Sequence, residues 1–108
     1  MNASETITAF MDCWKNQDFS NAPIQMTFLE NHKTLDVLEK VIKPLKLKKW
    51  KILKEVRVGD ACKELLLKVE YDKVKTQIRA RVICETAPYK PDVNGTWGVN
   101  PISLLKGL

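Results

Sequence analysis

Histidine is the usual general base at neutral pH, and this chain has a single one, His32. It lies between Asn31 and Lys33, in a stretch typical of a polar connection between helices, where a surface histidine without a role is the more common case. No local nucleophile motif accompanies it, although the partners of a Ser/His/Asp or Cys/His site are spatial and stay open at this stage. The sequence therefore predicts no catalytic residue.

The three cysteines, Cys13, Cys62 and Cys84, are 49 and 22 residues apart, so they lack the close spacing of paired zinc ligands. One intramolecular disulfide would leave a cysteine unpaired, which fits a reducing cytosol. Free cysteines are usually small buried hydrophobes. The four glycines, at positions 59, 95, 98 and 107, form no phosphate-binding loop. We therefore expect neither a metal ion nor a cofactor.

Charge is distributed unevenly along the 108 residues, whose net charge is +5. Residues 1–42 have a net charge of −3, residues 43–108 have +8, and residues 43–57 hold six Lys and one Arg against a single Glu. Such a stretch suits an anionic partner, which could be nucleic acid, a phosphate ligand or an acidic protein. The alternative, which we favour, is a solvated strand face whose lysines discourage edge-to-edge pairing.

Nucleic-acid binding is disfavoured by the alternation around Trp50, which points the indole into the core while Lys49 and Lys51 face outward. Arg79 and Arg81 share the outer face of a later strand. Three acidic residues, Glu64, Glu70 and Glu85, are expected on the same face, where cross-strand pairing would neutralise the cations.

Helices are predicted in the first part of the chain. Asn2 and Glu5 form a capping box, and apolar residues then recur with helical spacing, which predicts a helix over residues 4–16. A second short helix follows Ser20 or Asn21, with Ile24, Phe28 and Leu29 as its apolar face. Thr34 is expected to cap a third helix, which ends near residue 43, before Pro44; its apolar side consists of Leu35, Leu38, Val41 and Ile42.

Strands are predicted after Pro44. Trp50, Ile52, Val56 and Val58 lie at even positions interrupted by Lys54, which indicates a strand with a bulge, a snorkelling lysine or a strand end. Residues 65–71 and 74–84 alternate more cleanly, with turns at 59–61 and 72–73. Residues 86–94 are predicted as a loop, and residues 97–104 as a last strand in which Pro101 marks a bulge or an edge.

The order of elements predicts a single α+β domain over residues 1–108, with three N-terminal helices packed on one face of a curved antiparallel four-strand meander. The inner face of the sheet would carry Trp50, Leu67, Tyr71, Ile78, Val82 and Trp97, and Ile7, Phe10, Trp14 and Leu38 would pack against it. No apolar run is long enough for a transmembrane helix, and the first residues do not resemble a signal peptide, so we expect a cytoplasmic protein without membrane contact.

This arrangement resembles the nuclear-transport-factor-2-like superfamily, also called the cystatin-like or ketosteroid-isomerase-like α+β cone. Residues 10–19, Phe-Met-Asp-Cys-Trp-Lys-Asn-Gln-Asp-Phe, are similar to its opening aromatic helix and turn, and residues 95–103, Gly-Thr-Trp-Gly-Val-Asn-Pro-Ile-Ser, are similar to its closing strand. Members include isomerases, dehydratases, transport factors and secretion components, so the resemblance implies a fold and leaves the function open. Enzymes of the superfamily place Asp, Tyr or His inside the cone, where Asp12, Asp18, Tyr71 and His32 are the groups this sequence offers.

The sequence favours a non-catalytic binding or protein-interaction module of the cone fold, acting as a homodimer. A small apolar ligand is a further expectation, with Trp14, Trp50, Tyr71 and Trp97 as its contacts. Two alternatives stay open: a small-molecule-pocket enzyme of the isomerase or dehydratase type, and a basic-surface adaptor for nucleic acid or an acidic protein.

Overall fold

The computed structural model describes residues 1–29 and 31–108, and its first element is the helix α1, Ala3–Lys15. The predicted capping box is confirmed: the Asn2 side chain accepts a hydrogen bond from the backbone N–H of Glu5, and the Glu5 carboxylate accepts one from the backbone N–H of Asn2. The predicted apolar stripe is also confirmed, since Ile7, Phe10 and Trp14 are fully buried.

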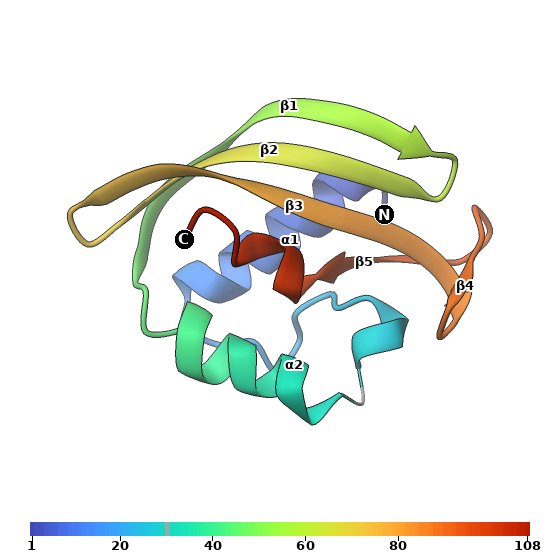
Figure 1. Cartoon of the computed structure of the whole chain (residues 1–108), viewed down its shortest axis with the longest axis horizontal. Coiled ribbons are helices and arrows are strands. Elements are labelled where there is room, and N and C mark those ends of the chain that lie inside the picture. The colour runs from blue at the N-terminus through green and yellow to red at the C-terminus, as the bar shows by residue number, and fades with distance from the viewer. Residues whose placement is uncertain (30) are drawn as a thin grey trace.

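The strands form one antiparallel sheet. Their bounds are β1 Leu47–Gly59, β2 Cys62–Tyr71, β3 Val74–Ala87, β4 Lys90–Pro91 and β5 Thr96–Asn100. The order is β1-β2-β3-β4, and β5 also pairs with β3 (Figure 1). The predicted α+β class is confirmed, whereas the predicted four-strand meander is wrong, because part of the expected loop forms β4 and two strands share β3.

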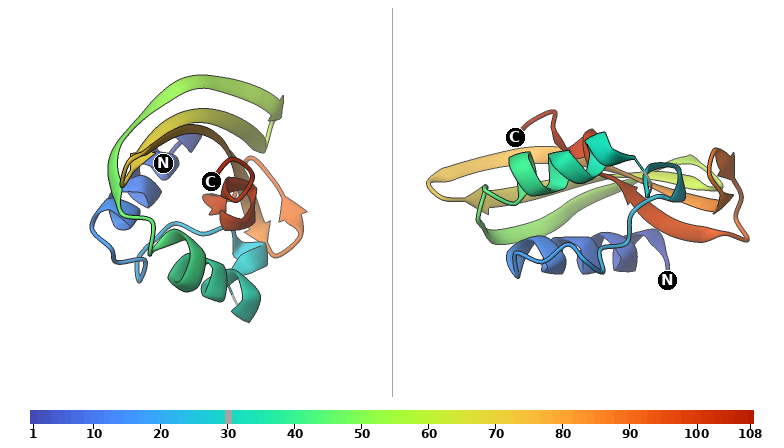
Figure 2. Two further views of the ribbon diagram at one scale, coloured as in Figure 1. Left: turned by 60° about the vertical axis from the view of Figure 1, so that its left-hand side comes forward. Right: turned by 90° about the horizontal axis from the view of Figure 1, so that it is seen from below.

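The inner face of the sheet packs against α1, which lies beneath the arch of β1, β2 and β3 (Figure 2). The core combines the α1 stripe with alternate residues of β2 and β3, namely Leu65, Leu67, Val69, Tyr71, Ile78, Ala80 and Val82. Alternation therefore assigned the faces of β2 and most of β3 correctly.

The second predicted helix is wrong. Residues 23–25 run extended beside β5, where Gln25 N–H donates to Val99 O and Val99 N–H donates to Pro23 O. A side chain at Gly98 would overlap the backbone of Gln25, so this close approach needs a glycine. Only a short 3₁₀ helix, η1 (Met26–Phe28), follows, and Leu29 is exposed. Backbone pairing with β5 competes with helix formation here.

The third predicted helix exists with different bounds. It comprises α2 (His32–Val37), capped by Asn31 instead of Thr34, and a π-helical turn, η2 (Leu38–Ile42). The buried stripe runs through Thr34, Leu38 and Ile42, whereas Leu35 and Val41 are exposed, contrary to prediction. The π turn, in which Lys43 N–H donates to Leu38 O, widens the helix and aligns residues four apart.

The last predicted strand is too long. β5 ends at Asn100, and a 3₁₀ helix, η3 (Pro101–Leu104), takes the place of its second half. Pro101 occupies the first turn, and the Asn100 side chain accepts a hydrogen bond from the Ile102 N–H, so this proline starts a helix instead of marking a bulge. Within the described residues, no helix is both long and apolar enough to cross a membrane.

Candidate functional site: the outer face of the sheet

A bulge in β1 decides which side chains reach the face of the sheet that α1 leaves uncovered. The register passes from Ile52 opposite Leu67 to Lys54 opposite Leu66, so Leu53 is an extra residue. The bulge, one of three explanations offered for Lys54, is therefore present. Beyond it, Val56 and Val58 are 42% and 53% exposed, so their predicted burial is wrong.

The outer face, as we call the side of the sheet opposite α1, is defined by cross-strand pairs from β1, β2 and β3. Residues directly opposite each other share a face. Seven cationic residues lie on it, Lys49, Lys51, Lys54, Lys68, Lys75, Arg79 and Arg81, together with the acidic residues Glu64 and Glu70. Its net charge of +5 equals that of the whole chain, so the remaining residues are neutral in sum.

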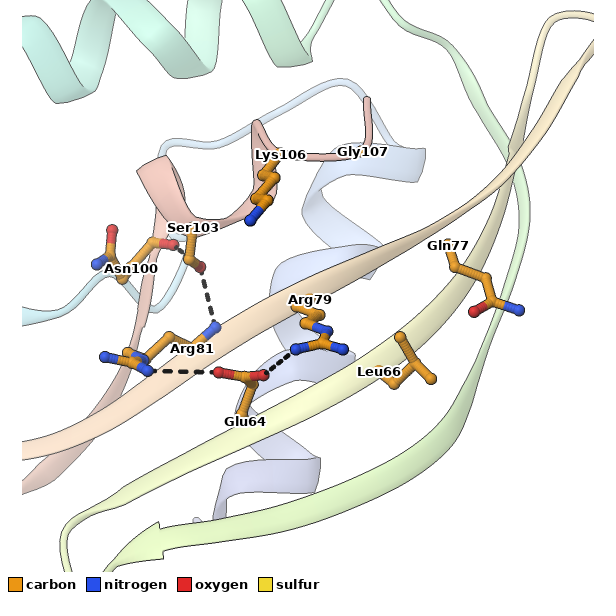
Figure 3. A pocket seen from close by; sticks show the side chains of 9 residues that line it. All are labelled: Glu64, Leu66, Gln77, Arg79, Arg81, Asn100, Ser103, Lys106 and Gly107. Carbon is orange, nitrogen blue, oxygen red and sulfur yellow. Dashed lines mark hydrogen bonds and ion pairs between the residues drawn. The ribbon is translucent and has the colours of Figure 1, made fainter.

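Glu64, Arg79 and Arg81 form a cluster on this face, across β2 and β3. Arg79 Nη1 lies 3.4 Å from Glu64 Oε1, and Arg81 Nη2 lies 3.4 Å from Glu64 Oε2, so one carboxylate bridges two guanidinium groups (Figure 3). The side chains of Arg79 and Arg81 are 74% and 46% exposed, whereas that of Glu64 is 25% exposed. The cations are therefore the accessible part of the cluster.

The C-terminal segment forms one wall of a groove over this cluster. Ser103 Oγ accepts a hydrogen bond from the Arg81 backbone N–H at 2.9 Å and donates to Asn100 O. Further along, Thr76 Oγ1 donates to Gly107 O at 3.0 Å. The groove has a volume of about 680 Å³, and Lys106 adds a further cation to it (Figure 3).

A second pocket on the sheet lies around Trp50. It has a volume of about 250 Å³, and Lys49, Lys51 and Lys68 contribute to its lining. Trp50 is half-buried and lies opposite Val69 on the inner face.

The other predicted ligand contacts lie in or beside the core. The structure brings Trp14 and Tyr71 together, with ring centroids 6.4 Å apart, and the Trp14 indole N–H donates to Leu45 O. Both are buried, whereas Trp97 is half-buried with the Lys63 ammonium 5.9 Å from its ring centroid. Trp14, Tyr71 and Trp97 line none of the pockets described here. Their role in ligand binding stays a prediction.

The candidate acid–base residues are dispersed. Asp12 and Asp18 are exposed, and the hydroxyl and backbone N–H of Ser20 lower the pKa of Asp18 by hydrogen bonding to it. His32 begins α2 on the surface. Burial raises the pKa of the thiols of Cys13, Cys62 and Cys84. Within the described residues, no three His, Cys, Asp or Glu side chains cluster as metal ligands do.

Glu85, Thr27 and Tyr89 form a polar clamp at the end of β3, which the sequence did not predict. Glu85 lies on the outer side of β3, as predicted, but it is 1% exposed because η1 covers it, so its predicted pairing with cations across the strands is wrong. Its carboxylate accepts hydrogen bonds from Thr27 N–H at 3.0 Å and Thr27 Oγ1 at 2.6 Å, and Thr27 Oγ1 accepts one from Tyr89 N–H. Tyr89, at φ 61°, is held in a left-handed turn, and the residue is 81% exposed.

The clamp borders a surface groove of about 900 Å³, lined in part by Met26, Leu29, His32 and Tyr89. No signal in the sequence points to this groove, because alternation along a strand cannot distinguish a buried glutamate from an exposed one on the same side.

Comparison with protein-family models, with curated proteins and with solved structures finds no match to this chain.

Proposed function

We propose that this protein is a small non-catalytic binding module of the cystatin-like cone fold whose outer face binds an acidic segment of a partner protein. The observation that carries the proposal is the segregation of charge: the outer face holds a net charge of +5, its seven cationic residues are exposed, and it faces away from α1. A surface of one sign attracts a partner of the other sign and speeds the encounter.

Exposed aliphatic side chains favour a protein over a nucleic acid. Leu53 and Val56 are exposed on β1, and Leu66 is half-buried between the cations. By contrast, the outward-facing residues of β1, β2 and β3 defined by the pairing include no aromatic side chain on which a base could stack. An acidic segment with interspersed apolar residues complements both features.

The predicted homodimer is part of this proposal, on a different surface. Two copies that met through their outer faces would oppose like charges, which is unfavourable. The dimer would therefore leave the outer face free for its acidic partner, and sedimentation of the free protein measures its mass directly.

Binding of a labelled peptide of alternating Glu and Leu, followed by fluorescence anisotropy at about 50 and about 200 mM salt, tests the proposal. We expect the combined variant Lys49→Gln, Lys51→Gln and Lys68→Gln to weaken binding about tenfold, since an exposed ion pair contributes about 0.2–1 kcal/mol. These lysines lie together on the outer face around Trp50.

The matched control, Lys33→Gln, Lys46→Gln and Lys90→Gln, removes the same charge from exposed lysines outside the outer face. It should change the affinity less than about threefold, since separated surface charges are screened by salt. Equal losses in the two triple variants, or no binding at low salt, would refute the proposal. If a single-stranded oligonucleotide of equal charge binds more tightly than the peptide, the partner is a nucleic acid and not an acidic protein.

A further inference from the structure

The bridge from Glu64 to two arginines suggests how the outer face recognises its partner; this inference rests on the proposed function. Each oxygen of Glu64 contacts one guanidinium, Arg79 on one side and Arg81 on the other, both at 3.4 Å. Strong charge-assisted N–H···O hydrogen bonds measure about 2.7–2.9 Å. Glu64 therefore orients the two guanidinium groups without saturating them.

Both guanidinium groups retain donors for a second anion. Each has five N–H groups, and the hydrogen bonds found among the described residues use one from each side chain, toward Glu64. Because two cations share one carboxylate, the cluster keeps a net charge of +1, and Lys106 raises that of the groove to +2. An incoming anion meets a local excess of positive charge.

The lining of the groove indicates what kind of anion fits. Leu66 offers an apolar surface on the groove beside the arginines, and the amide side chains of Gln77 and Asn100 offer hydrogen bonds at its margin (Figure 3). A carboxylate on an aliphatic stem matches this combination, and Glu64 itself shows that a single carboxylate can contact both guanidinium groups at once. The volume of about 680 Å³ has room for such a side chain and its neighbours.

We propose that Arg79 and Arg81 are the receptor for an acidic side chain of the partner protein, and that Glu64 is an internal competitor which the partner's carboxylate displaces. Glu64 keeps the arginines oriented in the free protein and lowers their affinity for weak anions. A partner must supply enough additional contact to displace it, which makes binding selective.

The variant Glu64→Gln tests the competition, with Glu70→Gln as its matched control. Glu70 lies on the same face and carries the same charge, but among the described residues it forms no ion pair, so its loss changes the field of the face without freeing a bound cation. We expect Glu64→Gln to tighten binding of the Glu/Leu peptide about fivefold, as loss of two exposed competing ion pairs allows, and Glu70→Gln to change it less than about twofold.

Two further measurements separate a receptor from a general field effect. Adding Arg79→Gln and Arg81→Gln to Glu64→Gln should abolish the gain. In ¹⁵N NMR, the Nε resonances of Arg79 and Arg81 should shift on addition of the Glu/Leu peptide and stay unchanged with a Gln/Leu peptide.

The outcomes distinguish this inference from the proposed function. If the peptide binds and Glu64→Gln behaves like Glu70→Gln, the competitor role is wrong and the proposed function stands. If the Nε resonances do not move on binding, Arg79 and Arg81 are not the receptor for the acidic side chain, and the proposed function again stands. If neither the wild-type protein nor Glu64→Gln binds the peptide, both fail.

Discussion

The two faces of the sheet are built by the same strands and differ completely in their environment. Along β2, Leu65, Leu67 and Val69 are buried against the core, whereas the residues between them lie on the outer face, where Lys68 is exposed. The inner face cannot change without loss of packing, because buried side chains are in contact on every side. The outer face is free of that constraint, and it carries most of the charged residues of these strands.

Two places break this division, and both show what controls it. At the β1 bulge, Glu55 takes an inner position opposite Leu65, where Ser4 Oγ donates to it, and Val56 turns outward. At the end of β3, η1 covers the outer side and buries Glu85. The faces are therefore set by register and by the elements that pack on them, and only then by side-chain polarity.

The largest expected effect separates two neighbouring leucines of β2. Leu67→Ala should lower the free energy of unfolding by about 2–5 kcal/mol, because it removes a fully buried side chain and leaves a cavity. Leu66→Ala, one residue away on the outer face, should cost less than about 1 kcal/mol. Urea denaturation followed by tryptophan fluorescence measures both changes.

This pair of variants also tests the face assignment itself. Equal losses would mean that a partner chain or a neighbouring segment covers Leu66 in solution, and the outer face would no longer be a free surface. Leu66→Ala should instead weaken binding of the acidic peptide, since Leu66 lines the groove.

Sequence predicted those features that depend on local periodicity. The α1 stripe and the faces of β2 and β3 follow from repeats of 3.6 and 2 residues, and alternation placed Arg79 and Arg81 together on the outer face. The groove could not be predicted, because it needs η3 beside β3, and residues 97–104 read as one continuous strand. The burial of Glu85 and the outward position of Val56 could not be predicted, because an adjacent helix and an extra residue in the strand, both non-periodic, decide them.

A smaller loss is expected when the clamp that covers the outer face at Glu85 is broken. Thr27→Val keeps the shape of the side chain but removes the hydroxyl that donates to Glu85 and accepts from Tyr89 N–H. We expect a loss of about 1–3 kcal/mol in the free energy of unfolding, since a buried carboxylate loses a donor. Thermal and urea unfolding measure it.

Thr96→Val is the control for the clamp, because Thr96 is exposed on β5, and it should stay within about 0.5 kcal/mol of the wild-type protein. A loss in Thr27→Val no larger than this would show that the Glu85 carboxylate finds water or another donor, and that its burial does not depend on Thr27.

The smallest effect concerns the thiols on the two faces. Cys84 is fully buried on the inner face, whereas Cys62 is half-buried and pairs with Ile83 on the outer face. Burial raises the pKa of Cys62, and the nearby Arg81 cation opposes that rise by stabilising the thiolate. The variant Arg81→Gln should therefore raise this pKa further and reduce the thiolate fraction at pH 8.

Alkylation of Cys62 by iodoacetamide, resolved by peptide mass spectrometry, should slow by about twofold in Arg81→Gln, as expected for loss of one weak exposed charge interaction. Cys13 is the internal reference, because its pKa is raised by burial and by Asp18 and Asp12, and Arg81 is not among the causes. Cys84 should react in neither protein until it unfolds. An unchanged rate at Cys62 would mean that the Arg81 side chain turns away from β2 in solution, and the two-arginine receptor would then lose one of its members.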